Sequence, residues 1–335
     1  GCRLDWKIGQ TLPARSLVRS VAISKNGQTL AYGSKDNKIN IWDLGRDGNW
    51  VFNQTLDLSS GDRKHAVKAL VISNDGQTIV SGGEGNTVKI WALDRDKRWG
   101  LSQRLDLNAG GHTDTILSVA ISNNGKTIVS GSVDDTVKIW ALGGDKRWGL
   151  SQRLDLSVDT LITSVAISND GQTVVSSDWE YIVKIWNLVG DSWVLSQILD
   201  LTEGEHKQAV EAVAISNDGK TIVSDSYAKV MVWGLGDDGK WALIQAENKA
   251  ISRHTDPVFS VAMSGDGQSV IFTVDDTVKV LKAPEDCKLT LPIVYAIEKE
   301  NLASKELSDL QSAIDWAEIH PGIKESLGNK GLVSL

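Results

Sequence analysis

Apolar and polar residues follow one pattern that recurs six times along this chain. Each copy has an apolar stretch ending in Val-Ala-Ile-Ser or a close variant, then an Asn-Asp-Gly turn, Gln-Thr-Ile-Val-Ser and Thr-Val-Lys-Ile-Trp. The last apolar residue of the first stretch marks the period, with spacings of 49, 49, 46, 48 and 48 residues. These anchors are Ile23, Ile72, Ile121, Ile167, Ile215 and Met263. Such a constant period predicts one supersecondary unit copied along the chain.

The third copy shows which structure each unit predicts. Four short stretches, 116–121, 127–130, 136–140 and 148–156, are separated by turns rich in Asn, Asp and Gly. These residues tolerate the positive φ angles of tight turns. We therefore expect each copy to form a four-stranded antiparallel sheet. A single sheet of this kind buries too little surface to be stable, so the copies should pack against one another.

Tryptophan supports this packing, because the chain has 13 Trp against three Phe and four Tyr. Eleven of them occupy two repeat positions, at the end of the third strand or at the start of the fourth. The first set is Trp42, Trp91, Trp140, Trp186 and Trp233, and the second is Trp6, Trp50, Trp99, Trp148, Trp193 and Trp241. Regular placement favours packing between sheets over an aromatic ligand site. Trp179 and Trp316 lie off the pattern.

These motifs resemble the WD40-repeat family over about 280 of the 335 residues. The resemblance implies an all-β fold, the β-propeller, in which a well-formed blade contains hydrogen-bonded Trp, Ser or Thr, Asp and His. The third copy alone has all four at matching positions, and we expect them to brace that blade. They are His112, Ser130, Asp134 and Trp140. The resemblance therefore predicts blades that are unequally braced.

We expect a six-bladed propeller that is closed by the N-terminal strand. Residues 5–12 resemble the fourth strand at 49–56 but precede the first complete repeat, while the sixth copy has only three strands of its own. Pairing the two would close the ring and leave no exposed sheet edge. The predicted domains are a propeller at 1–282 and a C-terminal extension at 283–335. A seventh blade formed by the extension is the alternative, although the extension lacks the motif.

The two cysteines flank this closing pair of strands. Cys2 precedes the N-terminal strand and Cys287 follows its expected partner, so antiparallel pairing would bring them together. A disulfide closing so long a loop would stabilise the fold by about 4–5 kcal/mol in the chain-entropy model. Two unrelated thiols are the alternative. A bridge would indicate a secreted or lumenal protein and free thiols a cytoplasmic one, so the sequence leaves the compartment open.

The C-terminal extension predicts one helix, at about 304–319. Ser304 is a good N-cap, apolar residues recur with a 3-4-3 spacing, and Pro321-Gly322 ends the segment. The apolar face comprises Leu307, Leu310, Ile314 and Ala317. This helix either packs on its own propeller or is offered to the groove of a partner. The candidate partner-binding residues are Leu307, Leu310, Ile314 and Trp316.

The formal net charge of −8 argues against a nucleic-acid backbone or an anionic lipid surface as the partner. No apolar run approaches the roughly 18 residues of a membrane span, so we expect no direct membrane insertion. The sequence has no glycine-rich phosphate loop, nucleophile elbow or zinc-binding motif. Equivalent histidines on separate blades lie too far apart to form one metal site. We therefore expect no cofactor and no metal.

Three classes of function remain, and we favour the first. It is a non-catalytic scaffold or subunit of a multi-subunit complex that binds other proteins through its loops and its C-terminal extension. The second is a carbohydrate- or small-ligand-binding propeller, which would need matching aromatic and polar loop residues in several blades. The third is an enzyme with a site at the channel mouth, which would need converging His, Asp or Glu side chains.

Overall fold

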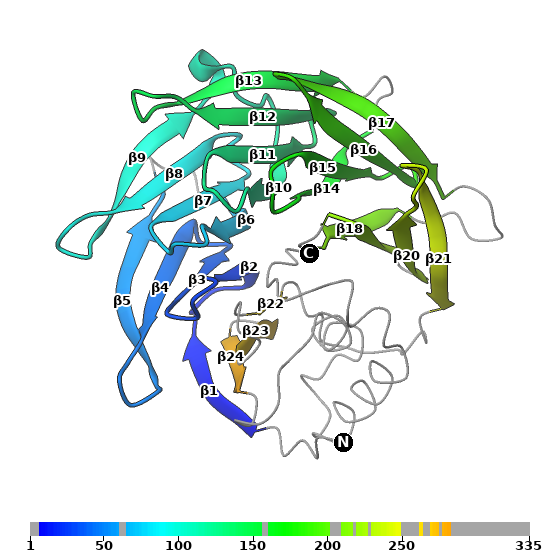
Figure 1. The fold of residues 1–335 in the computed structure, drawn as a ribbon. Helices are drawn as coiled ribbons and strands as arrows, with labels where there is room; N and C mark the ends of the chain where they lie inside the picture. Colours follow the sequence, from blue (N-terminus) through cyan, green and yellow to red (C-terminus); the bar gives the residue numbers. More distant parts are fainter. Residues whose placement is uncertain are drawn as a thin grey trace. The chain divides into compact units, whose positions relative to one another are not determined.

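The computed structural model describes residues 7–59, 65–155, 160–201, 209–216, 219–226, 229–248, 261–263, 269–274 and 277–282. Within these ranges the chain is all-β, with 24 strands in six four-stranded sheets (Figure 1). The one helix among the described residues is the 3-10 turn η1 (Leu107–Ala109). The helix expected at 304–319 lies outside the described residues.

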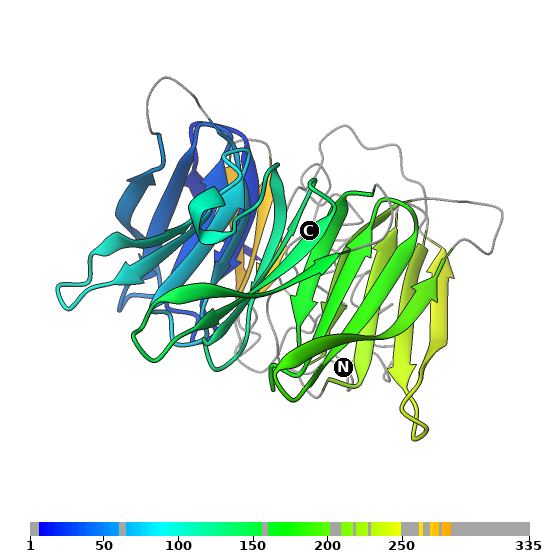
Figure 2. The same ribbon diagram turned by 90° about the horizontal axis from the view of Figure 1, so that it is seen from above.

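The chain forms two compact units. The first comprises Gly1–Ile79, Leu93–Gly100 and Ser252–Leu335, and the second comprises Val80–Ala92 and Leu101–Ile251. In Figure 2 the strands within a sheet run side by side, as the blue β2–β5 and the green β14–β17 show.

The strands follow the chain order within five of the six sheets. The first of these contains β2 (Val18–Ile23), β3 (Thr29–Ser34), β4 (Lys38–Leu44) and β5 (Trp50–Asp57). The next contains β6 (Val67–Ile72), β7 (Thr78–Gly83), β8 (Val88–Leu93) and β9 (Trp99–Leu105). The third contains β10 (Ile116–Ile121), β11 (Thr127–Ser132), β12 (Thr136–Leu142) and β13 (Trp148–Asp155).

Two further sheets repeat this arrangement. The fourth contains β14 (Ile162–Ile167), β15 (Thr173–Asp178), β16 (Ile182–Val189) and β17 (Ser192–Asp200). The fifth contains β18 (Val210–Ile215), β19 (Thr221–Ser226), β20 (Lys229–Leu235) and β21 (Trp241–Asn248). Every strand of the five sheets lies at a position that the repeat predicts.

The sixth sheet joins the two ends of the repeat region. Its order is β1 (Lys7–Pro13), β24 (Thr277–Lys282), β23 (Ser269–Val274) and β22 (Val261–Met263). β1 pairs antiparallel with β24, so that Lys7 lies opposite Lys282 and Leu12 opposite Val278. The N-terminal segment therefore supplies the fourth strand of a sheet whose other strands lie about 250 residues away.

Short turns with built-in hydrogen bonds set the register of the strands. Between β10 and β11, the Ser122 hydroxyl donates to Asn124 Oδ1 at 2.7 Å and accepts the Thr127 N–H at 3.0 Å. Gly125 adopts a φ of 67°, which glycine reaches without steric cost. Ser122, Asn124 and Gly125 each have a different task in this turn, which explains why these residue types occur at this repeat position.

Neighbouring sheets bury their apolar faces against each other. In the second unit, Val129, Val137, Ile139 and Leu154 form one cluster with residues of the next sheet. The other buried members are Ile162, Val165, Ile167, Val174, Trp186 and Trp193. Each large side chain that leaves water contributes about 1.5–3 kcal/mol, so the stacking of sheets supplies the core that one sheet lacks.

Candidate functional site

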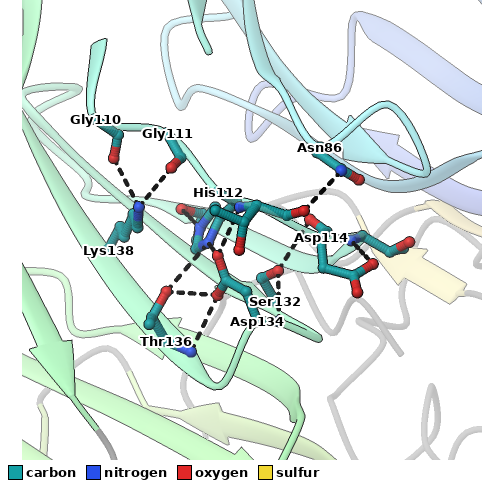
Figure 3. Close-up of polar contacts among 12 residues, drawn as sticks. Asn86, Gly110, Gly111, His112, Asp114, Ser132, Asp134, Thr136 and Lys138 are labelled. Atoms are coloured by element: carbon teal, nitrogen blue, oxygen red, sulfur yellow. Dashed lines mark hydrogen bonds and ion pairs between the residues drawn. The ribbon is translucent and has the colours of Figure 1, made fainter. Parts of the chain in front are cut away.

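A set of hydrogen-bonded polar side chains joins the sheet β10–β13 to the connection from β9 to β10 (Figure 3). β11 and β12 are joined by a hairpin in which Asp135 has a φ of 64°, a conformation that Asp tolerates. This turn directs Asp134 back toward His112, which lies in the segment that enters β10. Residues 22 positions apart in the chain thereby meet.

Four side chains form a continuous relay. Trp140 Nε1–H donates to Ser130 Oγ at 2.9 Å. Ser130 Oγ lies 2.7 Å from His112 Nε2, and His112 Nδ1 lies 2.9 Å from Asp134 Oδ2. With the Ser130 hydroxyl donating to Nε2 and Nδ1–H donating to Asp134, every hydrogen bond of the relay is satisfied by a neutral imidazole.

Burial sets the charge states within the relay. Removal from water lowers the pKa of His112 despite the attraction of Asp134, so the imidazole is neutral at physiological pH. Burial opposes ionisation of Asp134, but hydrogen bonds from His112, the Thr136 hydroxyl and the Thr113 N–H hold its pKa below the usual range. The Thr136 hydroxyl donates to Asp134 at 2.6 Å and the Thr113 N–H at 3.0 Å. The carboxylate therefore remains ionised.

A Ser-His-Asp order also occurs in hydrolytic enzymes, where the serine oxygen attacks a carbonyl. Here Ser130, His112 and Trp140 all have an exposed fraction of 0 %. The Ser130 oxygen also accepts the indole N–H of Trp140. A substrate carbonyl cannot approach an oxygen that is enclosed in this way, so the relay is suited to bracing the sheet.

Further hydrogen bonds attach the surrounding loop to the sheet (Figure 3). Lys138 Nζ donates to the carbonyls of Gly110 and Gly111 at 2.7 and 2.6 Å. Asn86 Nδ2, from the preceding sheet, donates to the Thr113 carbonyl at 3.0 Å. The loop that carries His112 is thus hydrogen-bonded both to its own sheet and to the preceding sheet.

The bond from a Trp indole to a hydroxyl recurs in other sheets. Trp91, Trp186 and Trp233 donate to Ser81, Ser176 and Ser224 at 3.0–3.2 Å. In the first sheet Trp42 donates to the Tyr32 hydroxyl, which itself donates to the Pro13 carbonyl at 2.6 Å. Burial raises the pKa of Tyr32 to about 12, so this hydroxyl keeps its proton.

Tyr32 therefore links the indole of Trp42 directly to the backbone before β2. In the sheet β10–β13, Ser130 and His112 together make the connection from Trp140 to the segment before β10. The sequence analysis did not identify Tyr32. Its signal is a Tyr at the repeat position where most copies have Ser, in a copy that lacks the loop histidine.

A second recurring contact links neighbouring sheets, and we call it the glutamine clasp. A Gln in the fourth strand of one sheet binds the backbone of the Trp that opens the fourth strand of the next. Its amide oxygen accepts the Trp N–H and its amide nitrogen donates to the Trp carbonyl, all at 2.7–2.9 Å. The clasps are Gln10–Trp50, Gln54–Trp99, Gln103–Trp148, Gln152–Trp193 and Gln197–Trp241.

A β-bulge lies directly before the clasp glutamine. In the sheet β10–β13, Ile139 pairs with Gln152 and Trp140 with Leu150, so Ser151 has no partner in the ladder. The same shift occurs before Gln54 and before Gln197. A bulge increases the local twist and re-aims the side chain that follows. The repeat pattern alone did not reveal the clasp, although Gln stands four residues after every fourth-strand Trp.

The structure brings together His112, Ser130, Asp134 and Trp140. Cys2, Cys287 and the extension residues Leu307, Leu310, Ile314 and Trp316 lie outside the described residues. Within the described ranges no group of three or more His, Cys, Asp and Glu residues is placed to hold a metal ion. No helix in that part of the chain combines the length and the apolar character that a membrane span requires.

The chain matches the family model described as WD domain, G-beta repeat. Four segments match it, at residues 6–43, 53–92, 105–141 and 154–187. The third segment contains His112, Ser130, Asp134 and Trp140. No curated protein matches the chain.

Proposed function

As the chain belongs to the WD40-repeat family, we propose that it is a non-catalytic scaffold that binds other proteins as a subunit of a larger assembly. One observation carries this proposal: the recurring polar side chains of the repeat bind other parts of the same chain. The relay of His112 and Ser130 is buried, and the glutamine clasps hold backbone groups of neighbouring sheets. Such residues give rigidity, and rigid elements with exposed connecting loops suit binding.

We propose further that the repeat region, 1–282, closes as a six-bladed propeller. The pairing of β1 with β24 supports this, because it completes a sixth sheet from the two ends of the region. The clasp positions give a direct test. Gln245 stands four residues after Trp241, as Gln103 does after Trp99, and the sixth fourth-strand Trp of the sequence is Trp6. In a closed ring, Gln245→Ala should destabilise the protein as much as Gln103→Ala does.

The register of the sixth sheet also supports the proposed disulfide. Lys7 lies opposite Lys282 and Ile8 opposite Leu281. Continuing this register by five residues in each strand would set Cys2 opposite Cys287. Directly opposed residues of antiparallel strands have Cα atoms about 4.5–5.5 Å apart, which is within the range that a disulfide spans.

Partner binding is assigned to the loops and to the C-terminal extension, 283–335. The sequence of the extension differs from that of the repeats. It can therefore give one side of an otherwise symmetric scaffold a surface that the other sides lack. Within it, Leu307, Leu310, Ile314 and Trp316 are the proposed contact residues.

Deletion of residues 303–335 tests this assignment. We expect the truncated chain to keep its β-sheet circular dichroism and its thermal midpoint, and to lose partners that the full chain captures from native extract. Capture of every partner at unchanged affinity would show that the extension is not a binding site. A purified sample that turns over a substrate, with activity abolished in a folded His112→Ala variant, would overturn the scaffold function itself.

A further inference from the structure

The hairpin between β15 and β16 has an aromatic side chain that the repeat does not explain. Trp179 is 59 % exposed, and it is the one largely exposed tryptophan among those the structure describes. Its backbone is firmly held, since Trp179 N–H donates to the Leu161 carbonyl and Asp178 accepts the N–H groups of Glu180 and Ile182. A fixed backbone therefore presents a large aromatic ring to water.

The next aromatic residue of this hairpin sits in a conformation that its type disfavours. Tyr181 has a φ of 72°, and the equivalent residues of three other sheets are Asn37, Asn86 and Asp135, with φ of 66°, 56° and 64°. Asn and Asp enter this left-handed region readily, whereas a bulky aromatic residue rarely does.

The backbone of Tyr181 performs the same task as that of Asn37. Leu201 N–H donates to the Tyr181 carbonyl at 3.0 Å, and Leu58 N–H donates to the Asn37 carbonyl at 3.0 Å. The turn therefore does not need the phenol ring. A strained position of this kind is a candidate for a functional role.

The surroundings of the hairpin are acidic. In a four-stranded meander, the hairpin between the second and third strands and the connection to the next sheet lie at the same end. In the second unit, the described turn and connection residues at this end are 84–87, 106–115, 133–135, 160–161, 178–181, 201 and 209, and these include no Lys or Arg. Their carboxylates are Glu84, Asp106, Asp114, Asp134, Asp135, Asp178 and Glu180. Asp178 is only 2 % exposed and Asp134 belongs to the buried relay, so the others carry the charge at the surface.

The strands that reach this end carry cations as well, because Lys89, Arg104 and Arg153 lie within a few residues of it and Arg153 acts electrostatically on His112. The exposed strand residues Asp200 and Glu211 add to the carboxylates, so negative charge still predominates.

Lys138 and Lys184 also belong to strands, and only 6 % and 7 % of these residues are exposed. Lys138 is already bonded to two carbonyls. The opposite end of the same unit is mixed in charge, because Lys126, Lys146 and Arg147 accompany its acidic residues. Negative charge therefore predominates at the end that carries the Trp179 hairpin, and it attracts positive charge.

We propose that the Trp179–Tyr181 hairpin is the centre of a docking site for a basic segment of a partner protein. A Lys or Arg side chain lies over the Trp179 indole, Glu180 pairs with the same or the next cation, and the surrounding carboxylates attract the flanking positive charges. Tyr181 supplies a second aromatic wall. This proposal rests on the scaffold function and names the chemistry of one partner. The same carboxylates repel nucleic-acid phosphates.

The probe is a fluorescein-labelled, unstructured nonapeptide of Lys, Arg, Gly and Ser with four positive charges, measured by fluorescence polarisation against the full-length chain. A matched peptide with Gln in place of each Lys and Arg is the ligand control. We expect the basic peptide alone to bind, with an affinity that falls as salt rises from 50 to 300 mM. Trp179→Ala should weaken binding by about 3- to 30-fold, the range of a cation–π contact. Glu180→Gln should weaken binding and reduce its salt dependence.

Two variants separate docking from folding. Tyr181→Asn restores the residue type that the turn prefers, so we expect a thermal midpoint about 1–3 °C higher together with weaker peptide binding. Phe52→Ala removes an exposed aromatic residue from β5 and should leave peptide binding unchanged.

Equal peptide affinity in the wild type and in Trp179→Ala would overturn the proposal. So would equal binding of the neutral peptide, or salt-independent binding of a neutral oligosaccharide that Trp179→Ala abolishes. None of these results bears on the scaffold function, because the turnover assay with the His112→Ala variant tests that function separately.

Discussion

Gln103 holds the backbone of Trp148 with both ends of its side-chain amide. Its Oε1 accepts the Trp148 N–H at 2.8 Å and its Nε2 donates to the Trp148 carbonyl at 2.7 Å. The two residues are 45 positions apart and belong to neighbouring sheets. One side chain therefore satisfies two backbone groups of the adjacent sheet.

Gln103→Ala should lower the free energy of unfolding by about 1–3 kcal/mol, because it leaves two backbone groups without their partner. Gln172→Ala is the matched control, since the side chain of this exposed turn glutamine makes only a 3.4 Å contact, with the Asp170 carbonyl, and the substitution leaves its backbone hydrogen bonds in place. Its effect should stay within about 0.5 kcal/mol. Urea denaturation measures both. Similar values for the two variants would contradict a stabilising role for the clasp.

The His112 relay predicts a loss of stability in mild acid. An unfolded chain protonates this histidine near its ordinary pKa of 6.5, whereas burial lowers the pKa in the folded protein. Between the two values the unfolded state binds more protons, so the free energy of unfolding falls as the pH drops through about 6.5. Asp134, whose pKa is also lowered, adds a further loss below its ordinary value of 3.8.

His112→Gln isolates this contribution, because the other histidines are unchanged. We expect the variant to be less stable at pH 7.5, by about 1–3 kcal/mol, and to lose less stability than the wild type between pH 7.5 and 5. Denaturant melts at a series of pH values give both quantities. The same slope in both proteins would mean that His112 does not control the acid response.

Gly131 and Gly149 lie in the same sheet, but we expect substitution by alanine to destabilise the protein only at Gly131. A Cβ on Gly131 would come within 2.6 Å of Ile162 Cγ2 in the next sheet, whereas a Cβ on Gly149 would meet nothing within 4 Å. Gly131→Ala should therefore destabilise the protein by about 1–3 kcal/mol through overpacking. Gly149→Ala should be neutral or slightly stabilising. Thermal melts of the two variants check the contrast, which fails if both are tolerated.

The proposed bridge between Cys2 and Cys287 predicts a protein without free thiols. Intact mass after alkylation should be unchanged in untreated protein and should rise by two alkyl groups after reduction. Reduction should also lower the thermal midpoint, because it releases the chain ends in the unfolded state. Two thiols that react without reductant would rule out the bridge.

The strands could be predicted from the sequence because every repeat contains the same pattern of apolar, polar and turn residues. The period of the anchors, the Asn-Gly turns and the regular tryptophans each indicate the same four-stranded unit. The relay of His112 and Ser130 was also foreseeable, through the resemblance of the third copy to a known family. Both follow from short-range patterns that a linear sequence displays directly.

The sequence by itself determined the repeated sheet, the pairs of strands and the positions of the bracing residues, because these depend on local alternation and turn chemistry. Only the tertiary structure decided what the equivalent residues do. It gave Tyr32 the role that a serine and a histidine share in another sheet, and it joined Gln103 to a backbone 45 residues away. It also left Trp179 exposed, whereas the described tryptophans at the regular repeat positions are buried or partly buried. Those outcomes depend on which surfaces meet when the sheets stack. The repeated sequence pattern is similar in every copy, so it does not show which contacts an individual residue makes with the neighbouring sheet.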